Sequence, residues 1–152
     1  MSKVFEDKFS ELQADMVSIC LEYVENRADA IYIYCSFEEK TISCDFFYCI
    51  NGKIVERHKL NDVIDGTKDV QYDTSSERQS GVLDIIIEDI EKMGKLCEEY
   101  DRDMPTEIKL IYNVANNSLR ADYRYDIVYS NHPEKTADDI SMEWFEEVKS
   151  NM

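Results

Sequence analysis

The sequence predicts an α+β domain in which about five antiparallel strands and three main helices follow the order α-β-β-β-α-β-β-α. Three amphipathic stripes with steps of three and four residues indicate the helices. Stretches that alternate between apolar and polar residues indicate the strands, and two pairs of them align their apolar residues when folded back as hairpins. Helices packed against one sheet would bury all of these residues, which is the usual α+β arrangement.

The first stripe, in residues 5–24, predicts an amphipathic helix. From Ala30 the period changes to two, which predicts a strand, a turn at Glu39 and Lys40, and a second strand. In this hairpin four apolar pairs share one face: Ile31 with Tyr48, Ile33 with Phe46, Cys35 with Cys44, and Phe37 with Ile42. The Asn51-Gly52 dipeptide favours a tight turn, so we expect a third strand over residues 53–58.

Residues 60–80 are polar and predict a long loop, with room for a helical turn. The second helical stripe follows in residues 83–100, and Pro105 lies beyond its end. Acidic residues that include Asp84, Glu88 and Asp89 are expected on the opposite, solvent-facing side of this helix. Two further strands fold back at a turn formed by Asn116 and Asn117. This turn pairs Ile108 with Tyr125, Leu110 with Tyr123, and Tyr112 with Ala121.

The last helix is expected to begin at Thr136, with Asp139 three residues later as its capping partner. Its apolar stripe includes Trp144. Across the chain we expect these side chains to be buried: Phe9, Leu12, Met16, Ile33, Phe46, Leu83, Ile87, Ile90, Leu110, Tyr123 and Trp144.

Composition indicates one folded domain over residues 1–152, because 43% of the residues are hydrophobic and no linker or repeat interrupts the pattern. The formal charge of -16 repels nucleic-acid phosphates and anionic membranes and attracts basic partners. The sequence also lacks a signal-peptide-like or membrane-spanning apolar segment. Its five cysteines form no CxxC pair, so we expect a cytoplasmic protein with reduced thiols and no direct binding to nucleic acid or membrane.

Catalytic and cofactor motifs are not evident in the sequence. His58 and His132 are its only histidines, and neither has the spacing of a catalytic arrangement. Four glycines form no phosphate-binding loop, and the acidic pairs follow no ordered metal-ligand pattern. We therefore expect no catalytic residue, no metal and no cofactor.

One face of the predicted sheet combines aromatic and charged residues, a mixture that suits protein recognition. An alternative is that a helix covers the aromatic part of this face. The candidate partner-binding residues are Tyr32, Tyr34, Asp45, Asp122 and Asp126.

The closing segment from Asn113 to Asp126, with its ADYRYD strand, and the following helix with Trp144 resemble the YezG-type immunity proteins, which include EsaG. The resemblance covers nearly the whole chain. It implies a small acidic cytoplasmic antitoxin that binds the toxic C-terminal domain of a secreted polymorphic toxin, often a nuclease exported by a type VII system. Inhibition would be stoichiometric, and the toxin domain would be basic. Two alternatives remain, namely an acidic interaction adaptor and a carboxylate-dependent metal enzyme.

Overall fold

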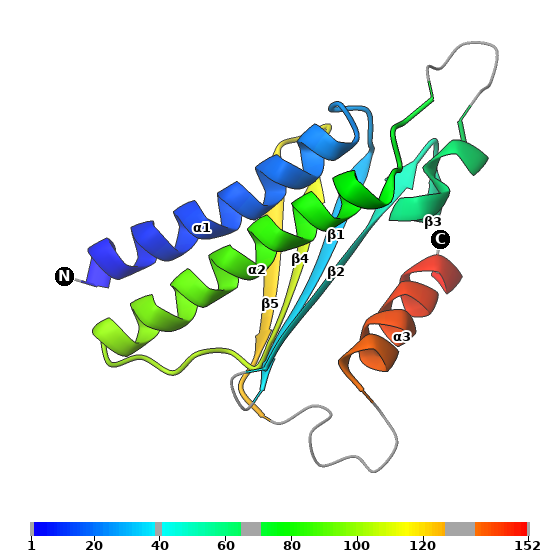
Figure 1. Cartoon of the computed structure of the whole chain (residues 1–152). Helices are drawn as coiled ribbons and strands as arrows, with labels where there is room; N and C mark the ends of the chain where they lie inside the picture. Colours follow the sequence, from blue (N-terminus) through cyan, green and yellow to red (C-terminus); the bar gives the residue numbers. More distant parts are fainter. Residues whose placement is uncertain (1, 39–40, 65–70, 127–135, 152) are drawn as a thin grey trace.

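A computed structural model of the chain describes residues 2–38, 41–64, 71–126 and 136–151 (Figure 1). It has the α+β class and the element order that the sequence predicts. The elements are α1 (Ser2–Tyr23), β1 (Ala30–Glu38), β2 (Thr41–Ile50), β3 (Lys53–Glu56), the 3-10 helix η1 (Arg57–Asp62), α2 (Ser76–Glu99), β4 (Glu107–Asn113), β5 (Ser118–Arg124) and α3 (Ala137–Ser150).

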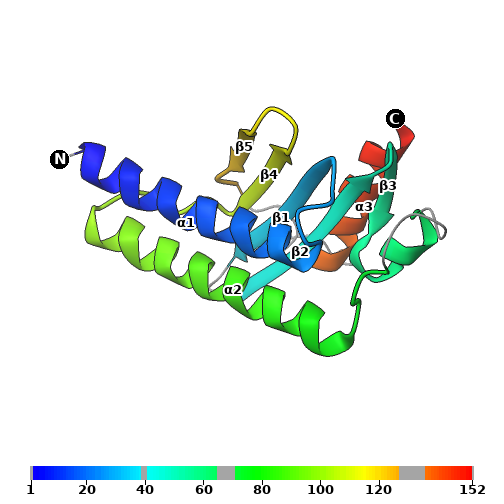
Figure 2. The ribbon, with the colours of Figure 1, turned by 90° about the horizontal axis from the view of Figure 1, so that it is seen from above.

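The five strands form one antiparallel sheet in the order β3-β2-β1-β4-β5. Helices α1 and α2 lie side by side on one face, and α3 lies on the opposite face near β2 and β3 (Figures 1 and 2). This placement leaves β5 at one edge of the sheet, away from α3. In the described part of the chain, no helix is both long and apolar enough to cross a membrane.

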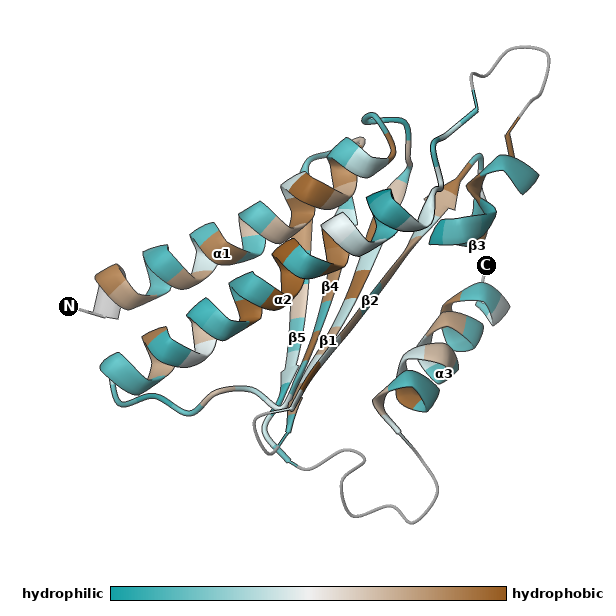
Figure 3. Cartoon of the chain, in the orientation of Figure 1, coloured by the Kyte–Doolittle hydropathy of each residue, from teal (hydrophilic) through white to brown (hydrophobic). Residues whose placement is uncertain are grey.

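The main core fills the space between the α1–α2 layer and the sheet, where apolar residues of the helices face the strands (Figure 3). Two buried phenols in it have hydrogen-bond partners. The Tyr48 hydroxyl donates to the Cys20 carbonyl at 2.7 Å, and the Tyr23 hydroxyl donates to the Arg57 carbonyl at 3.0 Å. These bonds offset the cost of burying polar hydroxyl groups and tie α1 to the sheet and to η1.

Most of the predicted core positions are confirmed. Met16, Ile33, Phe46, Ile90, Leu110 and Trp144 are buried. Phe9, Leu12, Leu83 and Ile87 are half-buried. Tyr123 was wrongly expected in the core, because its position on the edge strand β5 leaves it 39% exposed.

The predicted register of the first hairpin is confirmed, including the pairs Ile33 with Phe46 and Cys35 with Cys44. The tight turn that follows is also confirmed, since Asn51 and Gly52 have φ angles of 53° and 76°. The third strand is shorter than predicted. It ends at Glu56, and the backbone continues as η1, with Leu60 buried in the core.

The predicted register of β4 and β5 is wrong by two residues. Ile108 pairs with Tyr123 rather than with Tyr125, because the turn contains four residues, 114–117, instead of two. The Asn113 side chain accepts the Asn116 N–H at 3.2 Å, and Asn117 has a φ of 52°. A shift of two residues keeps every side chain on the same face, so the apolar pattern favours both registers equally.

The predicted loop over residues 60–80 is also too long. Helix α2 begins at Ser76, with the Ser75 hydroxyl accepting the Arg78 N–H at 3.4 Å. Residues 65–70 of that loop lie outside the described residues. The start of α3 agrees with the prediction, because Thr136 and Asp139 form a capping box.

Candidate functional site

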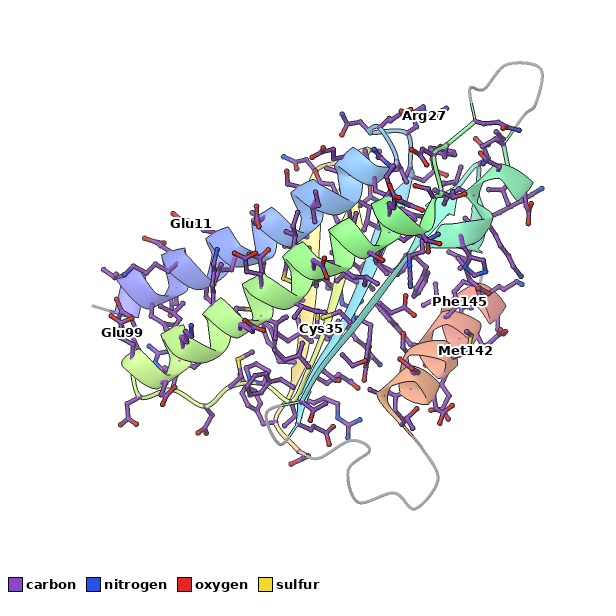
Figure 4. All side chains as sticks on the ribbon, in the orientation of Figure 1. Glu11, Arg27, Cys35, Glu99, Met142 and Phe145 are labelled. Carbon is purple, nitrogen blue, oxygen red and sulfur yellow. The ribbon has the colours of Figure 1, made fainter. Side chains whose placement is uncertain are left out.

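A groove of about 490 Å³ separates the outer surfaces of α1 and α2. Figure 4 labels two of its lining residues, Glu11 on α1 and Glu99 at the end of α2. Carboxylates and lysines from both helices surround a small apolar floor. The full lining consists of Lys8, Glu11, Leu12 and Asp15 from α1, and Asp89, Lys92, Lys95, Leu96 and Glu99 from α2.

Asp89 is the unusual residue of this groove, because its side chain is only 2% exposed and its Oδ2 has no hydrogen-bond partner in the described structure. An unpartnered buried carboxyl oxygen is costly, and natural structures contain few of them. Asp15, on the facing surface of α1, is exposed and interacts with Asp89. Burial is the main cause that raises the pKa of Asp89 from 3.8 to about 7, and the neighbouring carboxyl group of Asp15 adds to it.

The other charges near Asp89 act in opposite directions. Lys92 lowers the Asp89 pKa and Glu88 raises it, and these two residues form an i,i+4 ion pair at 3.3 Å on the surface of α2. From the sheet, the buried Cys35 thiol also interacts with Asp89. The raised pKa means that Asp89 keeps its proton to a higher pH than an exposed aspartate does. A cation placed between the two carboxyls would favour release of that proton.

The prediction that Asp89 lies on the solvent face of its helix is wrong, because Asp89 is buried. The buried stripe of α2 includes Val82, Ile86, Asp89, Met93 and Leu96, with alternating steps of four and three residues. Asp89 lies within that stripe. The spacing was a usable signal, but a carboxylate is rarely buried and was therefore placed with its acidic neighbours.

The aromatic part of the predicted recognition face is covered by α3. Tyr32 stacks on Phe47 with ring centroids 4.7 Å apart, and Trp144 contacts both rings edge-on. Tyr34 is 1% exposed, and its hydroxyl donates a hydrogen bond to the buried Glu107 at 2.8 Å. The structure thus favours the alternative of a covering helix. Tyr34 does not reach the surface, and Tyr32 is half-buried.

Asp45, the third candidate residue, connects three elements. Its Oδ1 pairs with the Arg57 guanidinium of η1, and its Oδ2 accepts a hydrogen bond from the Ser141 hydroxyl of α3 at 3.2 Å. The carboxylate remains partly exposed, with 38% of its side-chain surface accessible. This arrangement indicates that Asp45 helps to hold η1 and α3 on β2.

Asp122 lies in the same cross-strand row as Asp45 and Tyr34, but on the edge strand β5, two strands away from Tyr34. Asp122 is exposed on β5 and pairs with Arg120 at 3.4 Å. Asp126 is exposed just beyond β5, and its backbone carbonyl accepts a hydrogen bond from the Thr106 hydroxyl. Because Tyr34 is buried between its neighbours in this row, the five predicted residues do not form one exposed site.

Within residues 2–38, 41–64, 71–126 and 136–151, no group of three or more His, Cys, Asp or Glu side chains is placed to hold a metal ion. His58 lies at the surface, 3.2 Å from Glu56, and His132 lies outside the described residues. The five cysteines are free thiols, and burial raises the pKa of the Cys49 and Cys97 thiols.

Comparison of the sequence with models of known protein families gives no match, and comparison with curated proteins gives none either.

Proposed function

We propose that this protein is an immunity protein that binds a basic toxin domain and inhibits it stoichiometrically in the cytoplasm. The observation that carries this proposal is the Asp15–Asp89 pair in the α1–α2 groove, where a buried carboxyl has an oxygen without a partner. A lysine or arginine side chain of a partner would supply the missing donor and the opposite charge. The resemblance of residues 113–126 and of the Trp144 helix to the YezG-type family supports the same function.

The charge of helices α1 and α2 and of the whole chain supports a basic partner. Exposed carboxylates line the outer surfaces of both helices, and the whole chain has a formal charge of -16. Such a field accelerates encounters with a basic protein surface and disfavours acidic partners. The exposed carboxylates are Glu6, Asp7, Glu11, Asp15 and Glu22 on α1, and Glu77, Asp84, Glu88, Glu91, Glu98 and Glu99 on α2.

In the proposed mechanism the partner's cationic side chain enters the groove and displaces the proton of Asp89. The ionised pair then holds the cation by charge-assisted hydrogen bonds. If the bound surface is the one with which a nuclease holds phosphate, occupying it prevents substrate binding. This mechanism needs no catalytic residue in the immunity protein.

The experiment is co-expression with the candidate toxin encoded by the neighbouring gene, followed by co-purification and binding kinetics. Asp15→Asn and Asp89→Asn should each weaken binding by about tenfold or more, because each removes a charge from a desolvated contact. Asp84→Asn is the matched control, since Asp84 is exposed on the same helix and does not line the groove. It should change the dissociation rate little.

The outcomes separate the function from the site. If there is no complex and no rescue from toxicity, the immunity function is refuted. If a complex forms but neither groove variant alters it, the function stands and the groove is the wrong contact surface.

A carboxylate-dependent enzyme is a second candidate, because the Asp15–Asp89 pair could also exchange protons with a bound substrate. Under the immunity proposal the purified protein has no hydrolase or nuclease turnover of its own. Robust turnover that Asp89→Asn abolishes and Asp84→Asn preserves would favour the enzyme.

A further inference from the structure

The edge strand β5 exposes apolar side chains on a strongly acidic protein. Leu119, Tyr123 and Tyr125 are 40%, 39% and 58% exposed, and all three lie on or next to β5. In the described sheet β5 pairs only with β4, so its outer edge is unpaired. An unpaired edge with exposed apolar residues is a ready template for another strand.

The ladder determines which backbone groups of β5 face outward. The Phe37 N–H donates to the Thr106 carbonyl, and this hydrogen bond flanks the pair formed by Ser36 and Glu107. Ser36 and Glu107 are therefore not hydrogen-bonded to each other, so the N–H and C=O of Glu107 point away from β1 and toward β5. Glu107 pairs with Arg124, and the pattern alternates along the ladder. The outward N–H and C=O groups on β5 are therefore those of Leu119, Ala121 and Tyr123.

We propose that β5 pairs antiparallel with β5 of a second copy, centred on Ala121. In this register Leu119 lies opposite Tyr123 of the second copy, and Arg120 lies opposite Asp122. The two-fold axis repeats both contacts, so each dimer gains two pairs of opposite charge on one face and two apolar pairs on the other. The two five-stranded sheets would join into one continuous sheet.

The charges on β5 select this register over its neighbours. Moving the centre of the pairing to Arg120 places Arg120 opposite Arg120. Moving it to Asp122 places Asp122 opposite Asp122 and Arg120 opposite Arg124. Both shifts bring like charges together. Like charges directly opposite each other destabilise a strand pair, whereas opposite charges stabilise it. Pairing centred on Ala121 places each Arg120 against an Asp122. Pairing centred on Tyr123 would instead place Asp122 against Arg124, and the Arg124 variant below separates these two registers.

Two hollows beside β5 would receive side chains of the second copy in this register. One hollow of about 330 Å³ lies between α1 and the start of β5, and its lining includes Val17, Leu21 and Leu119. Tyr123 of the second copy would lie opposite Leu119, at this hollow. A second hollow of about 390 Å³, lined by residues including Phe9 and Tyr123, would receive Leu119 of the second copy.

Long-range repulsion opposes this dimer, since each chain has a formal charge of -16. At an ionic strength of about 0.15 M the screening length is about 8 Å, so distant charges interact weakly while the paired side chains remain in contact. No β5 residue lines the α1–α2 groove, and this proposal is therefore independent of the proposed function.

The first test is a charge exchange, with the mass of the purified protein measured by sedimentation from dilute to concentrated solution. Arg120→Asp and Asp122→Arg should each raise the dimer dissociation constant about tenfold or more, because attraction becomes repulsion at two symmetric contacts. The double variant should restore the wild-type constant. Arg124→Asp is the control, since Arg124 lies opposite Ser118 and its reversal should leave the dimer no weaker.

The second test is a cross-link across the two-fold axis. Ala121→Cys should form a disulfide between two copies under mild oxidation, because paired Cα atoms about 5.5 Å apart suit a disulfide. Ser118→Cys should not, since its opposite residue is Arg124. A wild-type protein that stays monomeric at all concentrations overturns the proposal, and so does a dimer that the Arg120 and Asp122 reversals leave unchanged.

Discussion

The Tyr34 hydroxyl donates a 2.8 Å hydrogen bond to Glu107 Oε2 beneath α3, where both residues are at most 2% exposed. The bond joins neighbouring strands β1 and β4 and partly compensates the burial of a carboxylate. Lys109, whose Nζ lies 3.8 Å from the other oxygen of Glu107, provides the nearby positive charge.

Removing this hydroxyl should destabilise the protein. Tyr34→Phe leaves the buried Glu107 with one donor fewer, so we expect a loss of about 1–3 kcal/mol in the free energy of unfolding, measured with urea. Tyr32→Phe is the matched control, because the described contacts of Tyr32 are ring contacts that phenylalanine retains. Equal losses in the two variants would contradict a specific role for the Tyr34 bond.

Trp144 should anchor α3 on the sheet. Its indole ring contacts Phe47, Tyr32 and Tyr34 with centroid distances of 5.2, 5.9 and 6.2 Å, and it is 6% exposed. Trp144→Ala should cost about 3–5 kcal/mol and increase amide hydrogen exchange in α3 more than in α1. Met142→Ala, at a position 45% exposed on the same helix, should change stability by less than about 0.5 kcal/mol. If exchange in α3 is unchanged by Trp144→Ala, another contact anchors the helix.

The first hairpin could be predicted from sequence because several constraints agreed. The pairs from Ile31–Tyr48 to Phe37–Ile42 share one buried face, and the Asn51-Gly52 turn has a strong backbone requirement. The β4–β5 register was not determined in this way. A four-residue turn and a two-residue turn place the same residues on each face, and only the local bonds of Asn113 distinguish them.

The candidate site was less predictable than the fold. The sequence pattern allows Tyr32 and Tyr34 to be either exposed recognition residues or residues covered by a helix. One sequence does not determine which face of a sheet each helix covers. The contacts of Trp144 with both tyrosines in the folded structure show that α3 covers them. The Asp15–Asp89 pair depends in the same way on how α1 and α2 pack against each other.

Asp89 should make stability fall as pH rises. Its pKa is about 7 in the folded protein and 3.8 in the unfolded reference, so between these values the folded state binds a proton that the unfolded state has lost. Asp89→Asn should therefore stabilise the protein more at pH 8 than at pH 4, by urea unfolding at both values, and Asp84→Asn should show a smaller difference. A pH-independent effect of Asp89→Asn would contradict the raised pKa.

The affinity for a basic partner should change with pH in the opposite sense. The proposed complex requires ionised Asp89, so binding should strengthen as pH rises through about 7, where the free protein loses this proton. Titration calorimetry in buffers of different ionisation enthalpy would detect proton release on binding. Asp89→Asn should abolish that release. If the wild-type protein binds the partner without releasing protons near pH 7, the cation does not enter between Asp15 and Asp89.

Salt should affect the two proposed interactions in opposite directions. Raising the ionic strength from about 0.01 M to about 0.15 M shortens the screening length from about 30 Å to about 8 Å. This change weakens the repulsion between two chains of charge -16, so pairing through β5 should become tighter.

The same screening should slow association with a basic partner, while the dissociation rate, which depends on contacts such as Asp89, changes less. Sedimentation and stopped-flow binding on one preparation measure both effects. A dimer that loosens over this range would mean that the Arg120–Asp122 contacts outweigh the repulsion between whole chains, and a partner association rate that is insensitive to salt would contradict electrostatic steering.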